Sequence, residues 1–280
     1  MTQNLWSGTA VVTGAGSGLG AAMVERFAAE GMSVMVLDID GERAEQTAQT
    51  VRNAGGKAQA VQLDVADRAA VETAARLTSE AFGSCNVLCA NVGVQQFGAV
   101  ERLTEQDWKW VLDVNVMGVV RTVDAFLPLL RGTSGTRRIV LTSSSAALVP
   151  GVRMAAYTAS KFAVMGYGET LRLELAPEGI GVSVLFPAGM RTRHLESSAR
   201  ARPGEIGQWT MMPDDIKAMK ESRKLDEAAH VVTAEHATRN LLRELAEDRR
   251  YIVTHGNYRD AFAERFDDIL AALERAHESR

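Results

Sequence analysis

Tyr157 and Lys161 stand four residues apart in the run Ala155-Ala-Tyr-Thr-Ala-Ser-Lys-Phe-Ala163, which has a helical pattern through Glu174. On a helix this spacing places both side chains on one face, with Cβ atoms about 5 to 6 Å apart. A free phenol has a pKa of about 10, but a neighbouring ammonium favours the phenolate. The pair predicts proton transfer by Tyr157. A half-buried aromatic beside a solvated lysine is the alternative interpretation.

Ser144 ends the expected fifth strand, a buried one, in the run Ile139-Val-Leu-Thr-Ser-Ser-Ser145. Open α/β sheets bind ligands at the carboxyl ends of their parallel strands. We therefore expect the Ser144 hydroxyl to hold a substrate oxygen. A polar strand end without a function remains the alternative.

The glycine-rich run Thr13-Gly-Ala-Gly-Ser-Gly-Leu-Gly20 joins the first expected strand to the first expected helix. Glycines there let the backbone approach a pyrophosphate, and the free amides of the helix start attract it, although a tight turn without a ligand has the same pattern. The second strand ends at Asp38, 18 residues after Gly20, where a carboxylate accepts both ribose hydroxyls and repels a 2'-phosphate. Asp40 is better placed than Asp38 to cap the next helix, and Ser17 puts no cation in the loop. The sequence therefore predicts NAD rather than NADP.

Short β-branched runs alternate with amphipathic segments along the chain. This order predicts an α/β fold: a doubly wound, parallel, seven-stranded, Rossmann-like sheet with helices on both faces. Asp40, Asp67 and Thr104 are expected to cap helix starts, and Gly31 to end a helix. The expected strands are 9–13, 33–37, 58–63, 87–89, 138–142, 182–186 and 251–254.

We expect one catalytic domain, 1–280, with an insertion at about 190–231. Residues 193–231 predict no strand and include Pro203 and Pro213. A long irregular connection is typically a functional lid or a linker, and the apolar side chains in this one favour a substrate lid. They are Leu195, Ile206, Trp209, Met211, Met212 and Met219.

The composition is that of a globular protein, with 46% hydrophobic and 24% charged residues. A formal charge of -4 and a pI near 5.8 predict neither a nucleic-acid nor a membrane partner. The first eight residues lack a leader pattern and no run reaches the roughly 20 apolar residues of a spanning helix, so we expect a cytoplasmic protein. Cys85 and Cys89 are expected to be reduced core thiols. The five histidines lack paired-ligand spacing, so no metal is expected.

In this order the motifs resemble the short-chain dehydrogenase/reductase family, in its TGxxxGxG and YxxxK subgroup, over about Thr9 to Thr192 and the last strand. The resemblance implies an NAD(H)-dependent oxidoreductase acting on CH-OH groups. Tyr157 would be the general acid/base, and Lys161 would lower its pKa and bind the nicotinamide ribose. Ser144, 13 residues before Tyr157, would orient the substrate. Asn115 would distort its helix and hold a water that links Lys161 to solvent.

The resemblance also implies a set of cofactor-binding residues, among them the adenine-contacting Asp64. Two positions depart from the family pattern: Ala90 replaces the first Asn of NNAG, and Ala188 replaces the Gly of PG. The first departure removes a sheet contact and the second changes a loop, but neither touches the proton relay. The implied set is Gly14, Ser17, Gly18, Leu19, Gly20, Asp38, Ile39, Asp64, Val65, Asn91, Gly93, Tyr157, Lys161, Pro187, Met190 and Thr192.

Apolar residues surround the expected reaction centre and predict a bulky hydrophobic secondary alcohol or ketone, aromatic or steroid-like. Packing of the lid onto the body is the alternative role for the same side chains. They are Val94, Phe97, Leu148 to Val152, Met154, Met190, Trp209 and the lid methionines.

A C-terminal helical extension is expected at about 257–278, with Phe262, Phe266, Ile269, Leu270 and Leu273 at helical spacing. Family members are commonly tetramers or dimers, so the resemblance implies a homo-oligomer. The extension could cap its own subunit or a neighbour's site, and the sequence leaves both open.

Two other functions remain open. A dinucleotide-sensing protein without turnover would use the same fold, although it should lack part of the Ser, Tyr and Lys set. An epimerase shares YxxxK, but usually has TGxxGxxG and a longer substrate domain.

Overall fold

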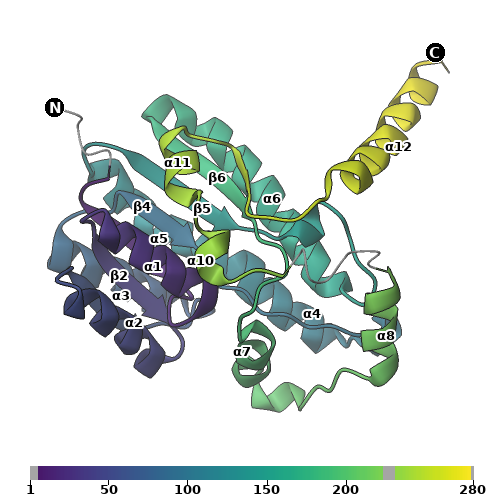
Figure 1. The fold of residues 1–280 in the computed structure, drawn as a ribbon, viewed down its shortest axis with the longest axis horizontal. Helices are drawn as coiled ribbons and strands as arrows, with labels where there is room; N and C mark the ends of the chain where they lie inside the picture. Colours follow the sequence, from purple (N-terminus) through teal and green to yellow (C-terminus); the bar gives the residue numbers. More distant parts are fainter. Residues whose placement is uncertain (1–5, 223–230, 279–280) are drawn as a thin grey trace.

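The computed structural model describes residues 6–222 and 231–278. Seven parallel strands form one sheet in the order β3-β2-β1-β4-β5-β6-β7 (Figure 1). The order changes direction at β1, which pairs with both β2 and β4. The predicted doubly wound sheet is confirmed. Its strands are β1 Thr9–Thr13, β2 Ser33–Asp38, β3 Ala58–Gln62, β4 Val87–Ala90, β5 Arg137–Thr142, β6 Ile180–Phe186 and β7 Tyr251–Val253.

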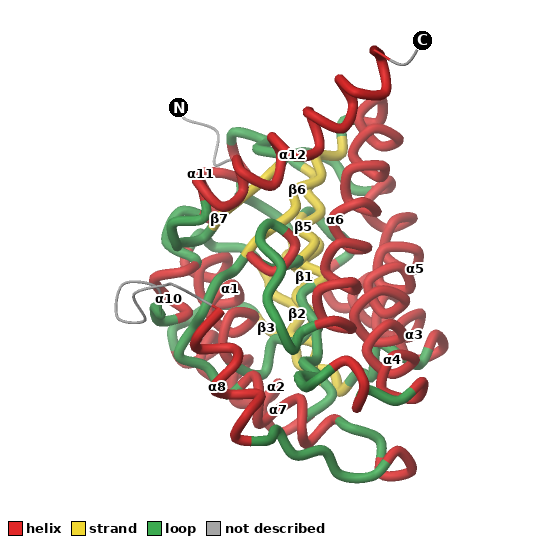
Figure 2. Tube along the Cα trace, turned by 90° about the vertical axis from the view of Figure 1, so that its right-hand side faces the viewer, coloured by secondary structure: helices red, strands yellow, loops and turns green. Residues whose placement is uncertain are grey.

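Helices cover both faces of the sheet (Figure 2). One face carries α3 Arg68–Phe82, α4 Glu105–Leu112, α5 Gly118–Gly132 and α6 Ala155–Leu175, and the other carries α1 Gly18–Ala29, α2 Gly41–Asn53, α10 Ala234–Ala237 and α11 Leu241–Ala246.

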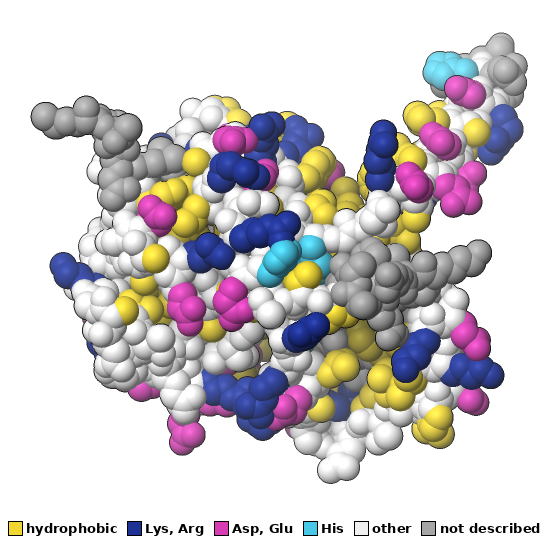
Figure 3. All heavy atoms as spheres, viewed as in Figure 1, with side chains coloured by type: hydrophobic (Ala, Val, Ile, Leu, Met, Phe, Trp, Pro, Cys, Tyr) yellow, Lys and Arg dark blue, Asp and Glu magenta, His cyan; other side chains and the backbone are white. Residues whose placement is uncertain are grey.

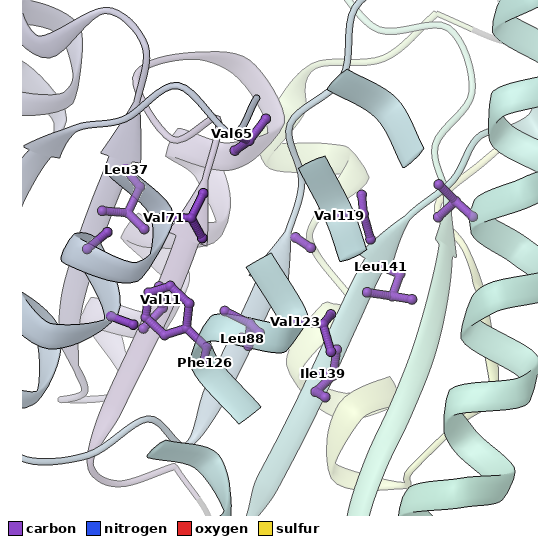
Figure 4. Packing of buried hydrophobic residues seen from close by; sticks show 14 of the residues in the cluster. Val11, Leu37, Val65, Val71, Leu88, Val119, Val123, Phe126, Ile139 and Leu141 are labelled. Carbon is purple, nitrogen blue, oxygen red and sulfur yellow. The ribbon is translucent and has the colours of Figure 1, made fainter. Parts of the chain in front are cut away.

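Successive side chains of a strand point to opposite faces, so each strand contributes to two cores. In β1, Val11 joins the core under α5, whereas Ala10 and Val12 join the core under α1. Figure 4 shows Phe126 of α5 beside Val11 and Leu88. Because the central strands are buried on both faces, they hold the ends of the strands, where the loops lie, in fixed positions.

The expected helix caps are present. Asp40 accepts from the amide of Arg43, and Asp67 accepts from the amides of Ala69 and Ala70. Thr104 forms a reciprocal capping box with Asp107 at the start of α4. Gly31 adopts a left-handed φ of 87° after α1, the conformation expected of a residue that ends a helix.

The segment 193–222 is more regular than the sequence suggests. It forms α7 His194–Ala201, a 3-10 turn Gly204–Ile206 and α8 Pro213–Ser222, so reading it as irregular was wrong. The side chain of the α7 cap residue Arg193 makes no capping hydrogen bond, which is why no cap marked the helix. Residues 223–230 of the expected insertion lie outside the described residues.

The two ends of the insertion lie together. Met190 and Val232 form a parallel β-bridge, in which the Arg191 amide donates to the Val232 carbonyl over 2.9 Å and the Val232 amide donates to the Gly189 carbonyl over 3.2 Å. The segment therefore leaves the body and returns to it at one place.

The C-terminal extension is a helix, α12 Arg259–Glu278, that points away from the body (Figure 1). Figure 3 shows hydrophobic and acidic side chains along it. Phe266, Ile269, Leu270 and Leu273 are 44 to 58% exposed. Among the described residues, no helix is long and apolar enough to cross a membrane.

Candidate active site

A cavity of about 1710 Å³ lies along the carboxyl ends of the strands and contains nearly all of the predicted site. The implied cofactor-binding residues all line it, and so does Ser144. Of the predicted site residues, only Asn115 is set back from its wall. The fold thus brings together residues as far apart in sequence as Gly14 and Thr192.

Lys161 is buried behind Tyr157. Its Nζ donates to the carbonyl of Thr142 over 3.0 Å and lies 5.6 Å from the centroid of the Tyr157 ring. A Cβ on Gly93 would lie only 3.0 Å from Nζ, so the small residue at position 93 leaves room for the ammonium. Burial lowers the pKa of Lys161 to about 8, because a low-dielectric surrounding penalises the charged form.

Asn115 lies in a π-helical turn, Asp113–Met117, between α4 and α5. Such a turn inserts an extra residue into a helix, often at a functional site. The Asn115 side chain accepts from the Val94 amide over 2.7 Å, and it donates to the Val94 carbonyl and to Ser160 Oγ. Ser160 in turn donates to the carbonyl of Tyr157. Asn115 therefore fixes the loop after β4 to the helix that carries Tyr157 and Lys161.

Ser143 and Ser144 have different surroundings. Ser143 Oγ donates to the Lys161 carbonyl over 2.8 Å, so it holds the strand end against α6. Ser144 Oγ accepts from the amide of Ala146 over 3.1 Å, which leaves its proton available for donation. This geometry fits the choice of Ser144 as the substrate-orienting residue.

The glycine loop packs too tightly for larger residues. A Cβ on Gly20 would lie 2.2 Å from the Gly14 carbonyl oxygen, and Gly18 has a left-handed φ of 55° with Thr192 packed against it. Ser17 begins α1 without a side-chain capping bond, so its hydroxyl does not occupy the free amides of the first turn. The loop therefore fits a pyrophosphate at the helix start.

Asp38 is held in place at the end of β2. The amides of Gly16 and Asp40 donate to its two carboxylate oxygens over 2.8 and 2.9 Å. Burial raises the pKa of Asp38, and these two hydrogen bonds oppose the rise. The carboxylate lies at the cavity wall, where it can accept ribose hydroxyls and repel a phosphate.

Asn91 supplies contacts between the strand ends near the departure at Ala90. Its Nδ2 donates to the carbonyl of Thr13 over 3.1 Å, and its Oδ1 accepts from Thr142 Oγ1 over 3.1 Å. Ala90 is buried in β4 opposite Leu141. The retained Asn thus connects β1, β4 and β5.

Part of the expected hydrophobic set does not line the cavity. Leu148 packs in a separate cluster with Val184 and Phe186, and Val152 is 46% exposed. The stretch Leu148 to Val152 was therefore wrongly predicted as a wall: it follows the 3-10 turn Ser145–Ala147 and Leu148 packs into that separate cluster. The predicted residues Trp209, Met211 and Met212 do not line the cavity either. The observed wall includes Val94, Phe97, Met154, Leu195 and Met219.

His194 is a cavity residue that the sequence reasoning missed. It begins α7, two residues after Thr192, and lines the same cavity as Lys161. Burial, followed by the positive charge of Lys161, lowers the pKa of His194 to about 4, so it is neutral at physiological pH. Its position after Thr192 was the only available signal.

Comparison with known proteins places this site in one family. The family model described as short chain dehydrogenase matches residues 8–203. The chain is 34% identical over 247 residues to 3beta-hydroxysteroid dehydrogenase 1 of Eggerthella lenta, covering 82% of this chain and 92% of that protein. It is 30% identical to 1-deoxy-11-beta-hydroxypentalenate dehydrogenase of Streptomyces exfoliatus, covering 95% and 90%.

A solved structure agrees with the sequence relatives. A short chain dehydrogenase/reductase from Burkholderia phymatum in complex with NAD is 32% identical, superposes with a TM-score of 0.86 and covers 96% of each chain. The matched residues 8–203 contain the glycine loop and the Ser144, Tyr157 and Lys161 set. The chain belongs to the short-chain dehydrogenase/reductase family.

Proposed function

We propose that this protein is an NAD(H)-dependent oxidoreductase that interconverts a bulky hydrophobic secondary alcohol and its ketone. The observation that carries the proposal is the position of Lys161, buried with its Nζ 5.6 Å from the Tyr157 ring centroid. The cavity that Tyr157 and Ser144 line is continuous with the glycine loop. The proposed proton-transfer residue Tyr157 and the proposed dinucleotide-binding glycine loop thus line the same cavity.

The residues divide the work of the reaction. Ser144 would donate a hydrogen bond to the substrate oxygen, and Tyr157 would take the alcohol proton or return it to the ketone. The Lys161 ammonium would stabilise the phenolate form of Tyr157. The nicotinamide, when bound, accepts or supplies the hydride. Asn115 would hold the helix that carries Tyr157 and Lys161 in position through its hydrogen bonds to Val94 and Ser160.

The choice of NAD over NADP is supported by Asp38, whose two oxygens are held by the amides of Gly16 and Asp40. A fixed carboxylate would repel a 2'-phosphate. The Burkholderia relative was solved with NAD.

The hydrophobic substrate is supported by the cluster of Phe97, Met154 and Tyr157, against which Met211 and Met219 of the segment 193–222 pack. Methionine and aromatic side chains suit a bulky apolar ligand. The Eggerthella relative is named for a hydroxysteroid. We propose that the segment acts as a substrate lid.

A turnover assay tests the proposal. Bulky and small secondary alcohols are offered with NAD, and NADH absorbance is followed for wild type and Tyr157→Phe. Tyr167→Phe on the same helix is the control, since Tyr167 does not line the cavity. We expect Tyr157→Phe to lose at least about a hundredfold, the usual contribution of general acid-base catalysis. Turnover retained by Tyr157→Phe would overturn the proposal. A preference of the wild type for small polar alcohols would overturn the proposed class of substrate.

Cofactor choice is tested by titration of NAD and NADP against wild type and Asp38→Ala. We expect wild type to bind NAD more tightly than NADP. In Asp38→Ala the difference between the two affinities should be smaller, because the repulsion of the 2'-phosphate is removed. Tighter binding of NADP by wild type would contradict the role given to Asp38.

We also propose a homodimer or homotetramer, supported by the exposed apolar side chains of α12. A helix of this length with an uncovered apolar stripe gains little stability alone. Light scattering of wild type against Leu270→Glu checks this, with Glu274→Gln as the control on the same helix. A monomeric wild type would contradict it.

We propose a cytoplasmic location. Cys85 and Cys89 are both free and buried, as in proteins of reducing compartments. Fractionation of cells that express the full chain tests this location.

A further inference from the structure

Trp209 connects the segment 193–222 to the loop that follows β4. Its Nε1 donates to the carbonyl of Phe97 over 2.7 Å. Its ring lies directly on Gly98, where a Cβ would come within 2.4 Å of Trp209 Cζ2. The guanidinium of Arg102 covers the ring, with 5.1 Å from Cζ to the centroid. The indole is thus held by a hydrogen bond, a backbone surface and a cation.

The residue that accepts this hydrogen bond touches the proposed general acid/base. The Phe97 and Tyr157 rings meet edge to face, with centroids 5.7 Å apart and planes at 87°. Both side chains are buried, at 8% and 5% exposed. On the other side of the indole contact, the Gly98 amide donates to the Arg153 carbonyl over 2.8 Å. The backbone at 97–98 is therefore fixed on two sides.

A buried carboxylate, Asp215, holds Arg102, the residue that covers the Trp209 ring. Asp215 in α8 has a side chain only 3% exposed, and it pairs with Arg102 and with Arg153, the latter over 3.3 Å. It also accepts from the Met212 amide. Arg102 thus contacts both the indole and Asp215. The buried carboxylate holds this arrangement because it would be costly to bury without its cations.

We propose that Trp209 is a positioning residue, which sets the place of the Phe97 ring and through it the orientation of Tyr157 and the width of the substrate space. The inference rests on the proposed function, because Tyr157 must be the proton-transfer group. Without the indole, the carbonyl of Phe97 loses its donor and Gly98 loses its cover. The Phe97 ring can then move away from Tyr157. This movement widens the cavity beside Tyr157 and lets the Tyr157 side chain change its orientation.

Trp209→Phe isolates the hydrogen bond, because it keeps a ring over Gly98 but removes the N-H. We expect kcat for a bulky secondary alcohol to fall about three- to tenfold, the value of one hydrogen bond. KM and NADH affinity should change less than twofold. The discrimination between bulky and small alcohols should narrow. Trp209→Ala should enlarge these effects and shift the pH profile of kcat, because water then reaches Tyr157.

Trp108→Phe is the matched control, since Trp108 is a half-buried tryptophan of α4 that packs against the core under α5, whereas Phe97 belongs to another cluster. It should leave kcat, KM and selectivity within twofold of wild type.

Gly98→Ala displaces the indole from the opposite side, by the clash with Trp209 Cζ2. It should reproduce the kinetic changes of Trp209→Ala. In the background of Trp209→Ala, Gly98→Ala should lower kcat little further, because the two substitutions remove the same contact. Fully additive losses would contradict a shared contact.

Several results would overturn the inference. One is wild-type kcat and selectivity in both Trp209→Phe and Trp209→Ala. Another is a fall in kcat of Trp209→Phe that is accompanied by a lower melting temperature and weaker NADH binding. Such a result would indicate a purely structural role. If Tyr157→Phe retains turnover, the proposed function itself is wrong. If Tyr157 proves essential while Trp209 is indifferent, only this inference fails.

Discussion

Arg202 and Asp107 form an ion pair that is buried on both sides. Arg202 Nη2 lies 2.6 Å from Asp107 Oδ1, and the side chains are 7% and 0% exposed. Asp107 also accepts from the amide and hydroxyl of Thr104, and the guanidinium lies 5.6 Å from the centroid of the Trp110 ring. The pair therefore fixes the chain after α7 to α4.

Arg202→Ala is expected to destabilise the protein, because it leaves the Asp107 carboxylate buried without its cation. Breaking such a pair costs about 3 to 5 kcal/mol, measured as the free energy of unfolding in denaturant. Arg200→Ala is the control. Its side chain is 57% exposed in its pairs with Glu196 and Asp40, so it should cost less than about 1 kcal/mol. Equal losses would contradict the role of the buried pair.

Lys161 should change the stability in alkali. Its folded pKa of about 8 is below the unfolded value, so between about pH 8 and 10.4 the unfolded chain holds the proton that the native protein has released. Stability then rises with pH in that window, by up to about 3 kcal/mol. Lys161→Met should remove this rise, whereas Lys109→Met, at a side chain 74% exposed, should keep it. A parallel rise in both variants would contradict the burial of the charge.

His194 makes a prediction of the same sign at acid pH. Its folded pKa of about 4 is below its unfolded value near 6.5, so in this window the unfolded chain gains a proton that the native protein refuses. Stability is lost as the pH falls from about 6.5 to 4. His194→Gln should lose less than wild type over this range, by unfolding at successive pH values. His236→Gln, at an exposed position, should follow wild type.

Gly20→Ala should weaken cofactor binding, because its Cβ would lie 2.2 Å from the Gly14 carbonyl oxygen and would displace the loop. We expect a loss in NAD affinity of more than about tenfold, or about 1.4 kcal/mol, by calorimetric titration. Gly166→Ala in α6 meets no atom within 4 Å and should bind NAD normally. It should also be stabilised by up to about 1 kcal/mol, since alanine favours the helix.

Much of the fold was predictable because its signals are local. The apolar runs of β1 and β6 predict strands buried on both faces, and Asp40, Asp67 and Thr104 cap the helices that they precede. The glycine loop, Asp38 and the Tyr157 and Lys161 pair each depend on short spacings. Their meeting in one cavity follows from the parallel sheet, which brings its strand ends to one edge.

The contacts of the segment 193–222 could not be predicted in the same way. Arg202 is 95 residues from Asp107 and Trp209 is 112 from Phe97, and neither pair has a spacing pattern. Helix α7 starts without a side-chain cap, so the segment looked irregular. Contacts made by tertiary packing decide this part of the molecule, and single-residue propensities do not encode them.

The β-bridge between Met190 and Val232 makes the insertion exchangeable. Since its ends meet at one point of the body, replacing what lies between them alters neither the order of the sheet nor the closure of the loop, and even a doubling of its length costs only about 0.6 kcal/mol in entropy. The glycine loop and Asp38 belong to the sheet, whereas the insertion supplies one part of the cavity wall, including Leu195 and Met219. If the proposed substrate role of the segment holds, grafting one segment should change the substrate, provided that the graft carries an Arg and a Trp at the positions of Arg202 and Trp209.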